Sequence, residues 1–82
     1  MSFFVYMLKS IERKPVTYVG YTISLKNRIK LHNAGKGAKF TRGRKWKLIY
    51  KEKVISKKEA ISREYYIKKN RSLRDKIKKK YI

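Results

Sequence analysis

The sequence predicts an α+β domain with the element order β-β-α-β-α-α. Three observations carry this prediction. A continuous apolar and aromatic run at residues 3–8 is followed by an alternating stretch at 17–21, as in a β-hairpin. Apolar residues recur at helical spacing after Ser24 and after Ser56, two residues that can cap helices. A further strand-like stretch at 46–55 separates the two helical regions.

The two strands of the predicted hairpin differ in how they are covered. Residues 3–8 are typical of a strand buried on both faces. Residues 9–15 are charged and end in proline, which predicts the connection. The second strand alternates. Because glycine weakens a strand, Gly20 is expected where another backbone or a ligand approaches closely.

The remaining elements follow from alternation and from capping signals. In the third strand, straight alternation places Trp46, Leu48, Tyr50 and Val54 on one face. With 82 residues and no internal repeat or linker, we expect a single domain over 1–82 with a thin core. The expected core includes Phe3, Val5, Leu8, Val19, Ile29, Leu48 and Ile61.

Two capping signals predict two helices after the third strand. Ser56 and Glu59 have the spacing of a capping box, so one helix begins near Lys57. Ser72 and Asp75 repeat that spacing before a last helix. Its apolar stripe is Leu73, Ile77 and Tyr81.

The first predicted helix, which Gly35 should end, carries two basic side chains in its apolar arc. At about 100° per residue, Leu25, Ile29 and Leu31 share one arc. Arg28 and His32 fall inside it. Because buried unpaired charge is costly, a helix that served only as cover would not place them there. We therefore predict that an anionic ligand meets this face.

The charge balance points to a polyanionic partner. The chain has 25 Lys and Arg against 5 Asp and Glu, a formal charge of +20. Coding bias or thermal adaptation would also add solvated charge, but an excess this one-sided favours nucleic acid over solubility alone. Composition does not separate DNA from RNA. No segment is long and apolar enough for a membrane span, and the absence of cysteine fits a reducing cytoplasm.

The basic segment 35–45 is punctuated by glycines but lacks the spacing of a nucleotide-binding loop. A flexible contact to the phosphate backbone is the favoured interpretation, and an ordinary solvated loop is the alternative. The candidate nucleic-acid-binding residues are Lys36, Lys39, Arg42, Arg44 and, further along the chain, Lys68.

Of the five acidic residues, only Glu64 faces inward on an amphipathic helix. Its neighbours on the apolar arc are Ala60, Ile61, Tyr65 and Ile67, whereas Arg63 falls on the far side. Glu64 could simply neutralise Lys68 at position i+4. One carboxylate can also help to hold a hard cation such as Mg²⁺ together with waters and substrate phosphates.

A metal-dependent nuclease needs three kinds of group: a cation, a group that activates or orients water, and a cationic clamp for the phosphate. Glu64 is the candidate for the first and Arg28 for the third. Tyr6, Tyr18 or His32 is the candidate for the second. Tyrosines more often pack and a lone histidine is more often structural, so each assignment taken alone is weak.

Five motifs in one order make the combination specific. The chain resembles the GIY-YIG nuclease domain over nearly its whole length, and most closely its small stand-alone bacterial members. The motifs that carry the resemblance are Phe4-Val5-Tyr6, Tyr18-Val19-Gly20, Asn27-Arg28-x3-His32, Arg63-Glu64-x2-Ile67-Lys68 and the run from His32 to Gly43. The first motif lacks the family's Gly and Ile, and only Asn70 is a candidate for a late family asparagine.

The resemblance implies a three-stranded antiparallel sheet flanked by helices. It also implies that Tyr6 activates or orients water, that Tyr18 and His32 assist proton transfer, and that Arg28 stabilises the phosphate. Glu64 would bind one divalent ion, Mg²⁺ or Mn²⁺. The expected function is cleavage of DNA phosphodiesters, including branched or nicked structures of the repair and recombination type, with a protein partner as one means of targeting. The alternative is a non-catalytic DNA- or RNA-binding domain on the same scaffold.

Overall fold

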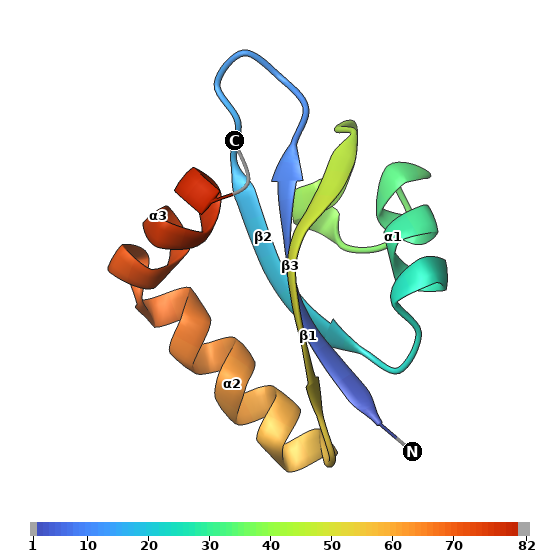
Figure 1. Ribbon diagram of the computed structural model, residues 1–82. Coiled ribbons are helices and arrows are strands. Elements are labelled where there is room, and N and C mark those ends of the chain that lie inside the picture. The colour runs from blue at the N-terminus through green and yellow to red at the C-terminus, as the bar shows by residue number, and fades with distance from the viewer. Residues whose placement is uncertain (1, 81–82) are drawn as a thin grey trace.

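The structure, a computed structural model, describes residues 2–80 and has the predicted α+β order. The strands are β1 (Phe3–Ser10), β2 (Thr17–Thr22) and β3 (Trp46–Val54), and the helices are α1 (Leu25–Asn33), α2 (Lys57–Lys69) and α3 (Arg71–Lys80). A short 3₁₀ turn, η1 (Lys39–Thr41), was not predicted. The strands form one antiparallel sheet in the order β2-β1-β3 (Figure 1). Within residues 2–80, no helix combines the length and apolar character needed to cross a membrane.

The sheet is covered on both faces. Helix α1 lies on one side, and α2 and α3 lie on the other (Figure 1). The central strand β1 serves both sides because its side chains alternate between them. Val5 and Met7 pack in the α2/α3 core, and Tyr6 and Leu8 pack in the α1 core. All four are almost completely buried, so the prediction of a strand covered on both faces is confirmed.

Strand β3 contains a β-bulge that the sequence pattern did not reveal. Met7 pairs with Tyr50 and Leu8 with Leu48, which leaves Ile49 without an opposite residue on β1. The extra residue reverses the alternation. Trp46 and Leu48 pack on the α1 side, whereas Ile49, Tyr50 and Val54 pack on the α2/α3 side. The prediction that Trp46, Leu48, Tyr50 and Val54 share one face was therefore wrong.

Helix α1 ends where the glycine signal placed its end. Gly35 has φ +76°, and the N–H groups of Gly35 and Lys36 donate to the carbonyl oxygens of His32 and Leu31 in a Schellman arrangement. Ser24 holds the N-cap position, although its side chain makes no capping bond. Leu31 is 39% exposed, so its predicted place in the buried arc was wrong.

Helix α2 begins as predicted, but its buried face is turned from the expected one. Ser56 Oγ accepts from the N–H of Glu59, and Ala60 and Ile67 are buried. Ile61 and Tyr65, predicted to be inward, are exposed. Arg63, predicted on the far side, donates twice to the carboxylate of Glu52 on β3 at 2.7 and 3.0 Å. The helix is thus rotated so that Arg63 faces the sheet.

Helix α3 is capped by Asn70 and not by Ser72. The N–H of Leu73 donates to Asn70 Oδ1 at 3.0 Å, which satisfies one of the free donors of the first turn. Asp75 pairs with Lys78 on the surface. Leu73 and Ile77 pack in the α2/α3 core as predicted, and Tyr81, the third member of the predicted stripe, lies outside the described residues.

Candidate active site

Tyr6 stands at the centre of the α1 side and is 1% exposed. Its hydroxyl oxygen lies 2.8 Å from Nε2 of His32, at hydrogen-bonding distance. The residue opposite Tyr6 on β2 is Gly20. A Cβ atom on Gly20 would lie 2.7 Å from that hydroxyl oxygen, closer than real Cβ atoms come. The close approach predicted at Gly20 is present, but the approaching group is the Tyr6 phenol and not the backbone or ligand that was predicted.

His32 projects from the last turn of α1 and is completely buried. Its two ring nitrogens have different partners: Nε2 meets Tyr6, and Nδ1 lies 2.9 Å from Oγ1 of Thr41. A Cβ atom on Gly37 would lie 2.4 Å from Nδ1. The loop after α1 therefore closes directly over the imidazole, and this needs a glycine.

Arg28 lies one helical turn before His32 and is only partly satisfied. Its Nη2 donates to the carbonyl oxygen of Gly37 at 3.2 Å. Its Nε is buried, and no acceptor for it is present among the residues that the structure describes. A buried donor without a partner costs free energy, and an anion placed beside it would relieve that cost. This fits the prediction that an anionic ligand meets the α1 face.

Burial keeps both Tyr6 and His32 neutral at ordinary pH. Desolvation raises the pKa of Tyr6 to about 12, although Arg28 partly opposes the rise through hydrogen bonding and charge. Desolvation also lowers the pKa of His32, and the charge of Arg28 adds to that effect. A neutral imidazole beside a neutral phenol can accept a proton, which is the state that acid–base chemistry requires.

Tyr18 borders the same site from β2. Its ring centroid lies 5.0 Å from that of His32 and 6.4 Å from that of Tyr6. Phe40, which is half-exposed, stacks on Tyr18 with centroids 6.2 Å apart. The structure thus brings Tyr6, Tyr18, Arg28 and His32 together, as the sequence predicted.

Glu64 lies on α2 and is paired with a lysine. Its Oε1 accepts from Nζ of Lys68 at 2.9 Å, so the simpler expectation of an i,i+4 pair is met. The pair is not remote. Nζ of Lys68 lies 6.0 Å from the ring centroid of Tyr18, and the negative charge of Glu64 contributes to the raised pKa of Tyr6.

The oxygen donors suit a metal held mostly by water and substrate. Between residues 2 and 80, no three His, Cys, Asp or Glu side chains gather as a protein metal cage. One partly buried carboxylate, that of Glu64, has the half-exposed ammonium of Lys68 as its partner. That set fits Mg²⁺, which is often bound by one or two carboxylates plus phosphate oxygens and waters.

The candidate nucleic-acid-binding residues differ in whether their side chains are exposed or held in ion pairs. Lys36, Lys39 and Arg42 are exposed. Arg44 pairs with Glu12 at 2.9 Å and lies over the ring of Phe40, and Lys68 is held by Glu64. Within the segment 35–45, Gly37 and Thr41 lie directly against His32 of α1.

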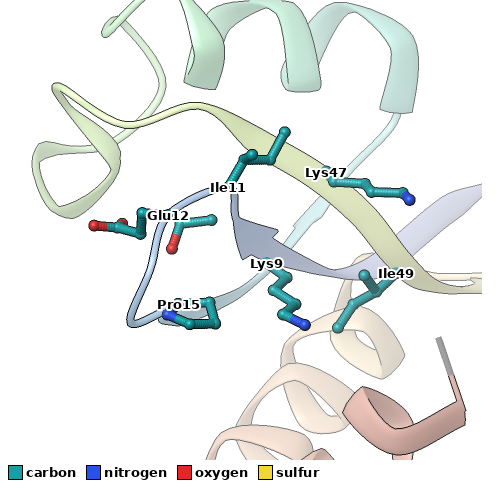
Figure 2. Close-up of a pocket in the computed structure, with 7 residues that line it drawn as sticks. Lys9, Ile11, Glu12, Pro15, Lys47 and Ile49 are labelled. Atoms are coloured by element: carbon teal, nitrogen blue, oxygen red, sulfur yellow. The ribbon is translucent and has the colours of Figure 1, made fainter. Parts of the chain in front are cut away.

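A separate hollow of about 260 Å³ lies at the hairpin end of the sheet. Figure 2 shows Lys9, Ile11, Glu12, Pro15, Lys47 and Ile49 around it. None of Tyr6, Tyr18, Arg28, His32 and Glu64 lines this hollow. The side chains suited to acid–base and phosphate chemistry therefore lie elsewhere, and the hollow is not part of the candidate active site.

Comparison with known proteins agrees with this arrangement. The profile of the GIY-YIG catalytic domain matches residues 2–80. The chain belongs to the GIY-YIG family. GIY-YIG domains form a nuclease superfamily, and its nucleases generally use a divalent metal.

Relatives of this GIY-YIG domain are small bacterial proteins. It is 54% identical over 67 residues to the UPF0213 protein CPE1444 of Clostridium perfringens, a match that covers 80% of this chain and 70% of the relative. It is 49% identical over 41 residues to the UPF0213 protein SpyM3_1077 of Streptococcus pyogenes, covering 50% of this chain and 42% of the relative. The solution NMR structure of the UPF0213 protein BH0048 from Bacillus halodurans superposes with a TM-score of 0.55 at 38% identity, covering 94% of this chain and 82% of that one.

Sequence reasoning missed two groups that build this GIY-YIG site. Thr41 looked like one polar residue of a basic loop, yet it is completely buried against His32. Asn33 fixes the end of α1 to β3, because its side chain accepts from the N–H of Trp46 at 2.6 Å and donates to the carbonyl oxygen of Trp46 at 3.3 Å. Both residues lie within the run from His32 to Gly43, so the motif was visible but its contacts were not.

Proposed function

We propose that this protein is a metal-dependent endonuclease that hydrolyses DNA phosphodiester bonds. The observation that carries the proposal is the buried hydrogen bond between Tyr6 and His32 beside the unsatisfied Nε of Arg28. A proton-transfer pair next to a cationic clamp has the parts that phosphodiester hydrolysis needs. The formal charge of +20 supports a polyanionic substrate.

The proposed roles follow from the positions of these side chains. Water attacks phosphorus and one P–O ester bond breaks. The hydroxyl oxygen of Tyr6 takes the proton from the water while its own proton moves to Nε2 of His32, so no free tyrosinate is needed despite the high pKa of Tyr6. Arg28 stabilises the added negative charge on the phosphate. Tyr18 packs beside both rings and helps to orient the water.

Glu64 would hold a single Mg²⁺ or Mn²⁺ when the substrate is bound. Bound there, the ion would polarise the phosphate and offset charge on the leaving oxygen. Lys68 must then release the carboxylate, and its exposed ammonium is free to turn toward a DNA phosphate. The exposed Lys36, Lys39 and Arg42 would contact the phosphate backbone, and Arg44 would do so once released from Glu12.

The proposed substrates are branched or nicked DNA of the kind met in repair and recombination. We place the reaction in the cytoplasm, which the absence of cysteine fits. RNA is the competing substrate, because a +20 surface attracts either polymer. Duplex, nicked and branched DNA and a matched RNA, compared at one salt concentration, decide between them.

The test of the reaction uses supercoiled plasmid with Mg²⁺ or Mn²⁺. We expect nicking by the wild-type protein, loss of nicking with chelator, and loss of nicking in Glu64→Ala. Glu59→Gln is the matched control, because Glu59 is an exposed acid on the same helix. Nicking that persists in Glu64→Ala at the wild-type rate would mean that the activity belongs to a contaminant.

The Glu64–Lys68 pair favours a second candidate, a non-catalytic DNA- or RNA-binding domain. In that case the carboxylate stays neutralised and only the basic surface is used. Binding would weaken with salt, with log K falling by ~0.9 per log unit of salt for each phosphate contact on duplex DNA. Chelator would change neither binding nor substrate integrity, which separates this candidate from the nuclease.

A further inference from the structure

Three polar atoms surround the hydroxyl oxygen of Thr41. The N–H of Ala38 donates to it at 3.2 Å, the carbonyl oxygen of Ala38 lies 2.9 Å away, and Nδ1 of His32 also lies 2.9 Å away. The hydroxyl has one proton to give. If that proton points to Nδ1 of His32, the hydroxyl oxygen of Thr41 and the carbonyl oxygen of Ala38 face each other at 2.9 Å with no proton between them. If it points to the carbonyl oxygen of Ala38, every contact is satisfied, provided that Nδ1 carries a proton and donates it to Thr41.

This proton count fixes the direction of the neighbouring hydrogen bond. A neutral imidazole carries one N–H, so a proton on Nδ1 leaves Nε2 with its lone pair. The hydroxyl of Tyr6 must then donate to Nε2 of His32 across the 2.8 Å contact. In the opposite tautomer Nε2 would donate to Tyr6 and could not receive its proton.

We propose that Thr41 is a positioning residue that holds His32 in its Nδ1–H tautomer, so that Nε2 is ready to accept a proton from Tyr6. The role of Thr41 in the reaction rests on the proposed nuclease function, whereas the tautomer itself does not. The arrangement follows the general logic of catalytic triads, in which a third group orients the base.

Thr41 is fixed well enough for this task. It is completely buried in the η1 turn, its N–H donates to the carbonyl oxygen of Ala38 at 3.1 Å, and its own carbonyl oxygen accepts from Nε1 of Trp46 at 3.0 Å. Gly37 lies against Nδ1 and leaves no room for the ring to turn away. The other titratable groups that face His32 are Tyr6 on β1, Tyr18 on β2 and Arg28 on α1. None of these supplies an acceptor to Nδ1, so that task falls to Thr41.

The tautomer can be read directly by NMR. In a long-range ¹H–¹⁵N spectrum near pH 8, the two nitrogens of the single histidine report which one carries the proton. We expect the wild-type protein to show Nδ1–H. In Thr41→Val, which keeps the shape but loses the acceptor, we expect a shift toward Nε2–H or an averaged signal. Thr41→Ser, which restores the hydroxyl, should return the Nδ1–H pattern.

Nicking assays give the second readout. We expect Thr41→Val to nick DNA about 10- to 100-fold more slowly, the usual effect of removing a group that orients a ligand or base, and Thr41→Ser to remain within about threefold of wild type. Thr22→Val is the matched control, because among residues 2–80 its hydroxyl hydrogen-bonds only the backbone of Ser24. A merely structural role for Thr41 would slow the reaction without moving the tautomer.

The outcomes are separable. A wild-type spectrum that shows Nε2–H overturns the inference, even if Thr41→Val fails to fold. An unchanged tautomer in a folded Thr41→Val overturns it as well. If the wild-type protein shows Nδ1–H but does not nick any DNA, the proposed function fails while the tautomer assignment stands.

Discussion

The two sides of the sheet bury different kinds of side chain. On the α2/α3 side the buried residues are aliphatic or small, among them Val5, Met7, Val19, Ala60 and Ile67. On the α1 side the central strand buries a phenol, the helix buries an imidazole, and the following turn buries a hydroxyl. Apolar contacts stabilise the first side. On the second side, hydrogen bonds link the buried polar side chains, and Gly20 and Gly37 leave the space that Tyr6 and His32 occupy.

The difference separates stability from chemistry. Aliphatic packing is non-directional and tolerates small shifts, whereas the polar chain from Tyr6 through His32 to Thr41 needs fixed angles and leaves unpaired groups if one member is lost. Changes in the aliphatic core of the α2/α3 side should therefore alter the free energy of unfolding first. Changes on the α1 side should alter activity first.

The largest expected effect is on activity, in Tyr6→Phe. Loss of the hydroxyl removes the proposed proton acceptor for water, so nicking should fall about 10²- to 10⁴-fold, or about 2.7 to 5.4 kcal/mol in the barrier. Tyr50→Phe is the matched control, because that hydroxyl bonds Glu52 on the other side of the sheet. Equal nicking rates for the two variants would contradict the proposal that activity depends on the α1 side of the sheet.

The counterpart on the α2/α3 side is Ile67→Ala. Ile67 is fully buried, and truncating such a side chain typically costs about 2 to 5 kcal/mol in the free energy of unfolding. Urea denaturation followed by circular dichroism measures this. Ile61→Ala on the same helix should change stability by about 0.5 kcal/mol or less, because Ile61 is 48% exposed. A small cost at Ile67 would show that the aliphatic core is not what holds the fold.

Gly20→Ala should affect both properties. The added Cβ would meet the Tyr6 hydroxyl, so either the phenol or β2 must move, at a cost of about 1 to 3 kcal/mol in stability and with slower nicking. Gly43→Ala is the control. The backbone of residue 43 has φ +77°, which strains an alanine, but no atom lies within 4 Å of the new Cβ. That variant should lose stability and keep its nicking rate per folded molecule.

The pH dependence of nicking tests the protonation states proposed for His32 and Tyr6 on the α1 side. His32 must be neutral to accept a proton, and its pKa lies below the ordinary value of 6.5. The rate should therefore hold from neutral pH down to about 6.5 and fall tenfold per unit once the pH drops below the His32 pKa. No alkaline loss is expected between pH 7 and 10, since the pKa of Tyr6 is about 12. A decline that began above pH 7 would contradict the assignment, and circular dichroism across the range controls for unfolding.

The smallest effect is expected at the pair between Glu52 and Arg63. Hydrogen bonds from Arg63 hold the pKa of Glu52 below its ordinary value, so the pair stabilises the fold above about pH 4.5 and loses that contribution as the pH falls through the lowered pKa. Because Arg63 is partly exposed, Glu52→Gln should cost only about 1 kcal/mol or less near pH 7. The stability difference between Glu52→Gln and wild type should shrink at pH 3. A constant difference would mean that charge is not the cause.

Sequence reasoning succeeded where a single residue type leaves few alternatives. The apolar run of β1 fits only a strand covered on both sides, and Gly35 adopts the left-handed conformation that ends α1. Arg28 and His32, predicted within the apolar arc of α1, lie beside Tyr6 as the α1 side of the sheet requires, and their roles in a site stay a prediction. The antiparallel sheet that the family resemblance implied is also confirmed.

The failures have a common physical cause, which is that periodicity describes an ideal element. Ile49 forms a bulge that no alternating pattern contains, so the faces of β3 were assigned wrongly. The rotation of α2 depends on Arg63 finding Glu52, a contact between elements that helical spacing cannot show. Thr41 sits in a turn with no periodicity at all, and its role becomes visible only beside His32.

The bulge at Ile49 also says which insertions and deletions this chain can accept. Removing that one residue would restore regular pairing with β1 and leave both faces as they are, because Met7–Tyr50 and Leu8–Leu48 would become consecutive pairs, with Leu48 still on the α1 side and Tyr50 still on the α2/α3 side. Removing a residue elsewhere within β3 would instead shift the register of part of the strand and turn the side chains there to the other face. The exposed hairpin connection at residues 11–15 carries no such constraint on its length. Relatives that differ in length by one residue should therefore place the difference in the hairpin or at Ile49 and not elsewhere in β3.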